Sequence, residues 1–185
     1  MSLNTTTTFQ SVRGYTTNSS TVTKLTYYYS DTYEAVIQRF RSQVPKIDVS
    51  QIRAATSAQD ITRVIEATNS PSGFVLFADY NHAGWMRHFT THETPLRRAQ
   101  RFTFGNPLYA LPILQRNIDV ALHIPLDCCF VEELEDKRVK LVVTLPISSA
   151  DSADDGMRQA LADLEDKVVA LIDSLTPQLC MTVSA

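Results

Sequence analysis

Apolar and polar residues alternate along several short stretches of the chain, and a period of two predicts β-strands. The first such stretch, 21–30, places three residues on one strand face: Leu25, Tyr27 and Tyr29. Residues 74–80 (FVLFADY) are apolar on both faces, which predicts a central strand. Further strands are predicted over 97–104, 121–134 and 139–145. We expect the strand over 121–134 to break or bulge near Pro125, because proline cannot donate to a strand ladder.

Other stretches repeat their apolar residues every three or four positions, which predicts helices. The first helix is predicted to begin after Asp31, with Glu34 completing a capping-box pair, and to end at Pro45. A second helical stretch is predicted to run to Thr68, with another start signal at Ser57 and Asp60. The last helix is capped by Asp154 and carries a narrow seam of heptad type: Met157, Leu161, Leu164, Val168, Leu171 and Leu175. Such a seam packs either on a sheet or on a partner helix, and both alternatives stay open.

The order of these elements predicts an α+β fold, with a mainly antiparallel sheet, helices packed on one face and a long C-terminal helix. The length of 185 residues suits one domain. We expect a disordered Ser/Thr-rich leader over 1–21, a single α+β domain over 22–176 and a tail over 177–185.

Composition excludes several classes of protein. The net charge is −3 without any basic block, which argues against a nucleic-acid partner. No apolar run approaches the roughly 20 residues that cross a bilayer, so we expect no membrane partner. The N-terminus has no apolar signal segment, and the three cysteines include the neighbours Cys128 and Cys129. Both features favour reduced thiols in a cytoplasmic protein.

The longest irregular stretch of the predicted domain, 81–95, holds the only tryptophan and three of the four histidines. His82 lies where a strand breaks into a loop, and its ordinary pKa near 6.5 suits proton transfer or ligation of a metal or haem. A histidine that closes the strand end by bonding to the backbone fits equally well. His88 and His92 are four apart, but their flanks are poor helix formers, so a solvated loop is favoured over a metal site.

Two further motifs have both a functional and a structural interpretation. Cys128 and Cys129 are adjacent on a predicted strand and so point to opposite faces, which prevents joint metal binding. Gly105-Asn106-Pro107 suggests either an anion site at a helix N-terminus or a tight strand-to-helix turn, and the turn is favoured. We therefore expect neither a metal nor a cofactor.

Three motifs carry a family resemblance: Pro71 to Ala83 (PSGFVLFADYNHA), Arg97 to Leu108 (RRAQRFTFGNPL), and Ala121 to Leu126 (ALHIPL) followed by FVEE. Over roughly 22–175 they resemble the family known as domain of unknown function 302, in the form seen in fungi and some bacteria. The resemblance implies a TATA-binding-protein-like α+β fold and a homodimer, but no established activity. Relatives commonly have Asp before the histidine. Asn81 stands there in this chain, and an amide cannot stabilise an imidazolium as a charge does.

The concentration of histidine and aromatic residues predicts a binding protein for a small apolar or aromatic metabolite, held beneath 81–95. The expected ligand-binding residues are Tyr80, His82, Trp85, Arg101, Asn106 and Tyr109. One alternative is a cofactor-independent acid–base enzyme of secondary metabolism, of isomerase, dehydratase or cyclase type, with His82 as its catalytic residue. Another is a structural or assembly protein that uses the seam of the last helix. Whether the chain is an enzyme stays open at this point.

Overall fold

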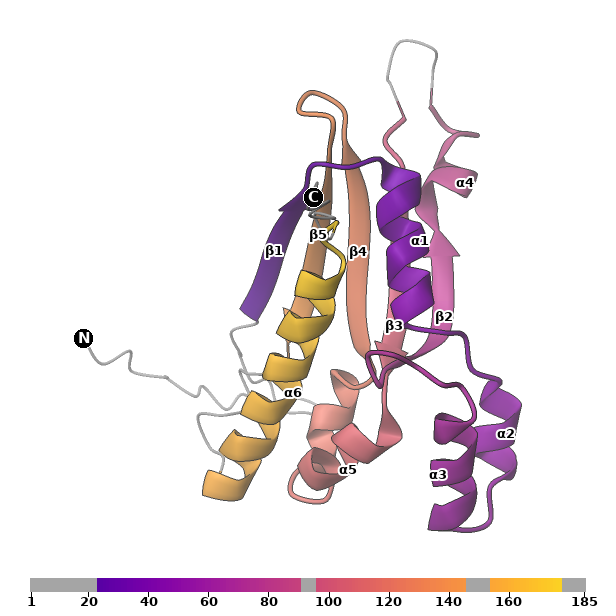
Figure 1. The fold of residues 1–185 in the computed structure, drawn as a ribbon, viewed down its shortest axis with the longest axis vertical. Coiled ribbons are helices and arrows are strands. Elements are labelled where there is room, and N and C mark those ends of the chain that lie inside the picture. Colours follow the sequence, from indigo (N-terminus) through magenta and orange to yellow (C-terminus); the bar gives the residue numbers. More distant parts are fainter. Residues whose placement is uncertain (1–22, 91–95, 146–153, 178–185) are drawn as a thin grey trace, which may run out of the picture.

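A computed structural model describes residues 23–90, 96–145 and 154–177. Its centre is an antiparallel sheet of five strands in the order β1-β5-β4-β3-β2 (Figure 1). The strands are β1 (Thr23–Tyr29), β2 (Val75–Asn81), β3 (Ala99–Gly105), β4 (Leu126–Glu133) and β5 (Arg138–Leu145). The predicted α+β class and the antiparallel sheet are confirmed.

The helices of the described ranges are α1 (Tyr33–Gln43), α2 (Val49–Ala54), α3 (Ala58–Glu66), α4 (His82–Met86), α5 (Pro107–Leu114) and α6 (Asp155–Ser174), with a 3₁₀ turn η1 (Ile118–Leu122). Polar caps set most of their starts. Ser57 caps α3, Asn106 caps α5 and Asp154 caps α6, each by accepting a backbone N–H of the first turn.

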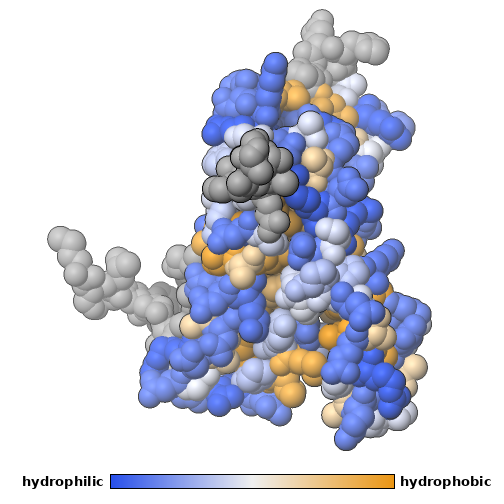
Figure 2. Space-filling model, viewed as in Figure 1, coloured by the Kyte–Doolittle hydropathy of each residue, from blue (hydrophilic) through white to orange (hydrophobic). Residues whose placement is uncertain are grey.

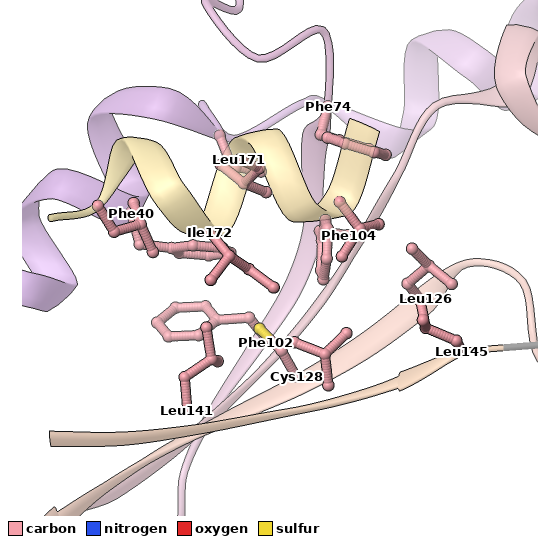
Figure 3. Packing of buried hydrophobic residues seen from close by; sticks show 14 of the residues in the cluster. Phe40, Phe74, Phe102, Phe104, Leu126, Cys128, Leu141, Leu145, Leu171 and Ile172 are labelled. Carbon is pink, nitrogen blue, oxygen red and sulfur yellow. The ribbon is translucent and has the colours of Figure 1, made fainter. Parts of the chain in front are cut away.

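The core lies between one face of the sheet and the helices α1 and α6 (Figure 1). Figure 3 shows rings from α1 and β3 beneath α6. The Phe40 ring contacts the rings of Phe102, Phe104 and Phe130 at centroid distances of 4.9–5.8 Å. All six seam residues of the last helix are buried in this core, so the seam packs on the sheet.

A second, smaller cluster joins α2 and α3 to the edge of the sheet at β2. Ile47, Ile65 and Val75 are its buried members. The chain at 45–47 lies along β2, where the Leu76 N–H donates to the Pro45 carbonyl and the Ile47 N–H donates to the Leu76 carbonyl. This second cluster involves the start of β2, whereas the other end of the strand, near Asn81, is exposed and polar.

Several predicted boundaries were wrong. The expected break near Pro125 is confirmed, since β4 begins at Leu126, but the residues before it are not a strand, because η1 occupies 118–122. Thr32, not Asp31, caps α1, because the Asp31 carboxylate instead pairs with Arg39 at 2.7 Å. The second helical stretch is two helices, and the start signal expected at Ser57 is confirmed, because Ser57 caps α3. Part of the stretch 81–95, which was expected to be irregular, forms α4. The expected leader over 1–21 and most of the expected tail lie outside the described residues.

Candidate functional site

Polar residues gather at one end of the sheet, where β2 and β4 finish and β3 and β5 begin (Figure 1). The antiparallel register brings these ends together, since Asn81 pairs with Gln100 and Glu133 pairs with Arg138. The connection from β1 to α1 reaches the same end, because Tyr29 pairs with Val139. Chain segments that are far apart in sequence therefore meet around two hollows.

The larger hollow, which we call the β4–β5 hollow, has a volume of about 500 Å³. It lies between the β1–α1 connection and the β4–β5 turn, and it is lined mainly by charged residues of both signs. The charged lining residues are Asp31, Glu34, Arg98, Glu132, Glu133, Lys137 and Arg138. The smaller one, the α4 hollow, has a volume of about 220 Å³ and shares Tyr33 and Arg98 with its neighbour. The two hollows are neighbours that share Tyr33 and Arg98, and we call the pair the cleft.

Arg98 holds the middle of the cleft through bonds to two carboxylates. Its Nε and Nη2 donate to the two oxygens of Glu132 at 2.7 and 2.6 Å, and Nη1 donates to Glu34. Its guanidinium also lies 4.7 Å from the centre of the Tyr33 ring. The hydrogen bonds from Arg98 lower the pKa of Glu132 below its usual range, and those to Glu132 raise the pKa of Arg98. Arg98 is thus electrostatically satisfied within the protein.

Tyr33 forms the buried floor of this region. Burial raises the pKa of its hydroxyl to about 12, and the hydroxyl donates to the Phe130 carbonyl over 3.5 Å. The phenol therefore stays protonated at neutral pH. It offers the cleft an aromatic surface and a fixed hydroxyl, and it offers no base.

The α4 hollow collects hydrogen-bond donors that have no partner in the part of the chain that the structure describes. Asn81 uses its Oδ1 to accept the Gly84 N–H at 2.9 Å, which caps α4 and leaves the Nδ2 group available. Gln100 and Arg87 also line this hollow, and neither side chain bonds to any residue that the structure describes. A Cβ at Gly84 would approach the Asn81 amide to 3.2 Å, so glycine allows the cap and the amide to share this space. The hollow is therefore rich in donors and carries one cation without a counter-ion among the described residues.

The predicted residues Tyr80, His82 and Trp85 lie beside the cleft and partly in solvent. Tyr80 is 51% exposed and Trp85 is 55% exposed. His82 is half-buried, and its Nδ1 accepts from the Trp85 Nε1 over a long 3.4 Å. It is not among the described residues that line either hollow, and no described carboxylate bonds to it. Catalysis by His82 stays a prediction.

Arg101 belongs to the face of the sheet that α1 and α6 do not cover. It makes two bonds to Asp127, at 3.0 and 2.6 Å, and its guanidinium lies 5.7 Å from the centre of the Tyr80 ring. Its pKa is raised by these bonds to Asp127. The structure therefore pairs Arg101 with Tyr80, but on the opposite side of β3 from Arg98.

Asn106 and Tyr109 lie at the far end of β3, about 20 Å along the strand from the cleft at 3.3 Å per residue. Asn106 is only 6% exposed. Its Oδ1 accepts the Leu108 N–H at 2.8 Å, and its Nδ2 donates to the Gly73 carbonyl at 2.7 Å. The Gly-Asn-Pro motif thus makes the strand-to-helix turn, and the six predicted ligand residues do not meet in one pocket.

Within the described ranges, the other histidines and the cysteines show no site. His88 is exposed just after α4, and His92 lies outside the described residues. Burial raises the pKa of both Cys128 and Cys129, which opposes thiolate formation. In the described ranges no group of three or more His, Cys, Asp or Glu residues is arranged to hold a metal.

Sequence reasoning missed Tyr33, Arg87, Arg98 and Glu132 as site residues. A signal for Arg98 was present, because residues 98, 102 and 104 have the same parity. Phe102 and Phe104 were expected on one face of a strand, and alternation places Arg98 on the same face. The sequence pattern alone held no comparable signal for the pairing of Arg98 with Glu132, which depends on register.

Comparisons with known proteins agree with this architecture. No helix of the described ranges is long and apolar enough to cross a membrane. Among solved structures, the crystal structure of an uncharacterized conserved protein DUF302 from Bacillus stearothermophilus matches with a TM-score of 0.56 and 14% identity, over 82% of this chain and 97% of that chain. At this identity the likeness shows the fold alone. No curated protein was matched. The family model described as domain of unknown function DUF302 matches residues 50–175, which is more than half of the chain, so the chain belongs to the DUF302 family.

Proposed function

We propose that this domain binds a small organic acid in the cleft at the polar end of the sheet, with the acid group in the α4 hollow. One observation carries the proposal: the donors of Arg87, Asn81 and Gln100 face one hollow without partners among the described residues. A guanidinium and two amides are suited to a carboxylate, which accepts several hydrogen bonds at once.

The rest of the cleft defines what the body of the ligand meets. Leu96 and Ala83 add apolar surface to the α4 hollow, and Tyr33 adds a ring at its junction with the β4–β5 hollow. The β4–β5 hollow of about 500 Å³ lies within the size range of small-molecule sites, roughly 300–1,000 Å³. These surfaces suit an aromatic or partly apolar acid whose end opposite the acid group is polar and reaches the β4–β5 hollow.

Arg98 is not the anchor in this proposal, because Glu34 and Glu132 already neutralise it. A ligand that displaced either carboxylate would have to replace strong charge-assisted bonds. Arg87 has no such competitor among the described residues. The two arginines therefore have different roles, with Arg98 shaping the cleft and Arg87 meeting the ligand.

The test uses benzoate, phenylacetate and 4-hydroxybenzoate as probes, each beside its neutral amide, with thermal unfolding as the readout. A probe at 100 times its dissociation constant adds about 2.7 kcal/mol to the free energy of unfolding. We expect the acids to raise the melting temperature of the wild type and the amides to leave it unchanged.

The informative variant is Arg87→Glu, which reverses the charge of the α4 hollow that has no counter-ion among the described residues. Arg53→Glu is its control, since Arg53 is an exposed arginine on α2 with no described side-chain partner. The acids should stabilise Arg53→Glu and fail to stabilise Arg87→Glu. Equal stabilisation of both variants, or no stabilisation of the wild type by any acid, would contradict the proposal.

A further inference from the structure

A separate groove lies at the other end of the molecule, between α5 and α6. Its volume is about 390 Å³, which is also within the range of small-molecule sites. The apolar helix α5 forms an orange area at the lower edge of the molecule in Figure 2, beside the bluer surface of α6. None of the residues that line this groove lines the cleft at the polar end of the sheet.

The walls of the groove are mainly apolar. Leu108 and Pro112 come from α5, and Ala160 and Leu164 come from α6. Leu108 is 39% exposed, so it presents apolar surface to solvent. The Tyr109 ring forms a further wall, held in place by an edge-on contact with Phe74 at 5.5 Å. These surfaces would gain free energy by burial against a flat apolar molecule.

The charged residues at the rim of the groove differ in how many partners they have. Lys167 places its Nζ 5.0 Å from the centre of the Tyr109 ring and forms no ion pair with a described residue. Arg116 is held by the Pro112 carbonyl at 2.9 Å and by Asp154 at 3.5 Å. Asp163, also on the rim, accepts from Gln159 at 2.8 Å. Lys167 is therefore the rim cation that is available to a negatively charged group.

We propose that the α5–α6 groove is a second binding site, for a flat apolar molecule that carries one anionic group. The flat part lies between Leu108, Pro112 and Leu164, and the anionic group meets Lys167. This site does not depend on the cleft or on the acid proposed there. It accounts for exposed apolar residues of α5 beside a lysine that has no ion pair among the described residues.

The test is a titration of the full chain with two fluorescent probes that share their ring system. One is 1-anilinonaphthalene-8-sulfonate, and the other is the neutral N-phenyl-1-naphthylamine. We expect saturable binding of both, with the sulfonate bound about fivefold more tightly, the effect of one partly exposed ion pair. Amide resonances of Gly156, Ala160 and Lys167 should shift with the same binding curve.

Three substitutions decide between this groove and other surfaces. Lys167→Glu should weaken binding of the sulfonate at least fivefold and leave the neutral probe unchanged, whereas Asp163→Asn should strengthen binding of the sulfonate. Lys24→Glu, an exposed lysine on β1, is the charge-matched control and should change neither. Lys167 and Asp163 are exposed, so both variants should keep the wild-type circular dichroism and melting curve.

Three results would overturn the proposal. One is equal affinity of the sulfonate for the wild type and Lys167→Glu. Another is the absence of saturable binding. The third is a set of shifted resonances at Gly84 and Gln100 instead of the groove, which would place the probe in the cleft. Arg87→Glu should leave binding of the sulfonate in the groove unchanged, so failure of this proposal and failure of the acid-binding cleft are distinguishable.

Discussion

Arg98, just before β3, and Arg101, within β3, are three residues apart and lie on opposite sides of the sheet. Arg98 lies on the side of the sheet that faces α1, where it bonds Glu34 and Glu132. Arg101 lies on the other side and bonds Asp127. Both are arginines with paired carboxylates, yet of the two only Arg98 lines the cleft. Parity along the strand, and not residue type, separates a site residue from a surface ion pair.

The bond between Arg98 and Glu132 predicts a specific pH dependence of stability. The pKa of Glu132 is lower in the folded protein than in the unfolded chain, because Arg98 stabilises its carboxylate. The pair therefore contributes stability above the unfolded pKa of about 4.3, and this contribution is lost as the pH falls through the folded pKa.

Glu132→Gln tests this dependence by urea unfolding at pH 7 and pH 3. We expect a loss of about 1 kcal/mol at pH 7, less than a fully buried charged bond because both side chains are partly exposed. The difference from wild type should shrink toward zero at pH 3. Glu66→Gln, at an exposed position without a described side-chain partner, is the control and should change little at either pH. A loss that is the same at both pH values would contradict the assignment.

At the scale of elements, β1 and α6 are joined by one buried hydrogen bond. The Tyr29 hydroxyl donates to the Ile172 carbonyl at 3.0 Å, near the end of the last helix. Burial raises the pKa of this hydroxyl, so it stays a donor at neutral and moderately alkaline pH. The first strand and the last helix are 143 residues apart along the chain at this contact.

Tyr29→Phe removes this bond and keeps the ring. We expect a loss of about 1 kcal/mol in the free energy of unfolding, since the Ile172 carbonyl loses a buried donor. Tyr28→Phe is the matched control on the neighbouring residue, because Tyr28 is exposed and its hydroxyl has no described partner. Chemical denaturation of both variants measures the difference. Equal losses would show that the hydroxyl does not hold α6 to β1.

Local patterns predicted most elements, because the periodicity of a strand or helix depends only on residues within that element. Alternation found most strands, and the seam from Met157 to Leu175 found the longest helix. The apolar run 74–80 correctly predicted a strand but not its place, because β2 is an edge strand whose second apolar face packs on α2 and α3. The strand predicted before Pro125 was wrong because the apolar residues there fit both a strand and a 3₁₀ turn, and only tertiary packing separates them. The cleft was not predicted because it forms where strand ends meet, and register joins residues such as Arg98 and Glu132 that no local pattern connects.

At the scale of the whole molecule, one aromatic cluster connects the helices to the sheet. Phe40 of α1 is 1% exposed and contacts rings from β3 and β4 (Figure 3). Removal of this ring leaves a cavity between the two layers. Because α1 also carries the residues of the cleft at its N-terminal end, the cavity weakens the attachment of the site as well as the core.

Phe40→Ala should therefore lower the free energy of unfolding by about 3–5 kcal/mol, measured by urea denaturation. Phe89→Ala is the control, because Phe89 is 82% exposed and should cost less than about 0.5 kcal/mol. Near-ultraviolet circular dichroism should show whether the packing of the remaining rings survives. A small loss for Phe40→Ala would contradict the view that α1 is anchored by this ring.

The position of α4 has a practical consequence for anyone who works with this protein. The chain has a single tryptophan, Trp85, and it lies half in solvent on the helix that borders the α4 hollow. Indole emission therefore reports on one corner of the molecule and not on the core. A change in its wavelength or quenching on addition of a compound reads out events beside His82 directly. Global unfolding leaves this solvent-facing indole in similar surroundings. Unfolding is therefore better monitored by a signal from the backbone than by indole emission.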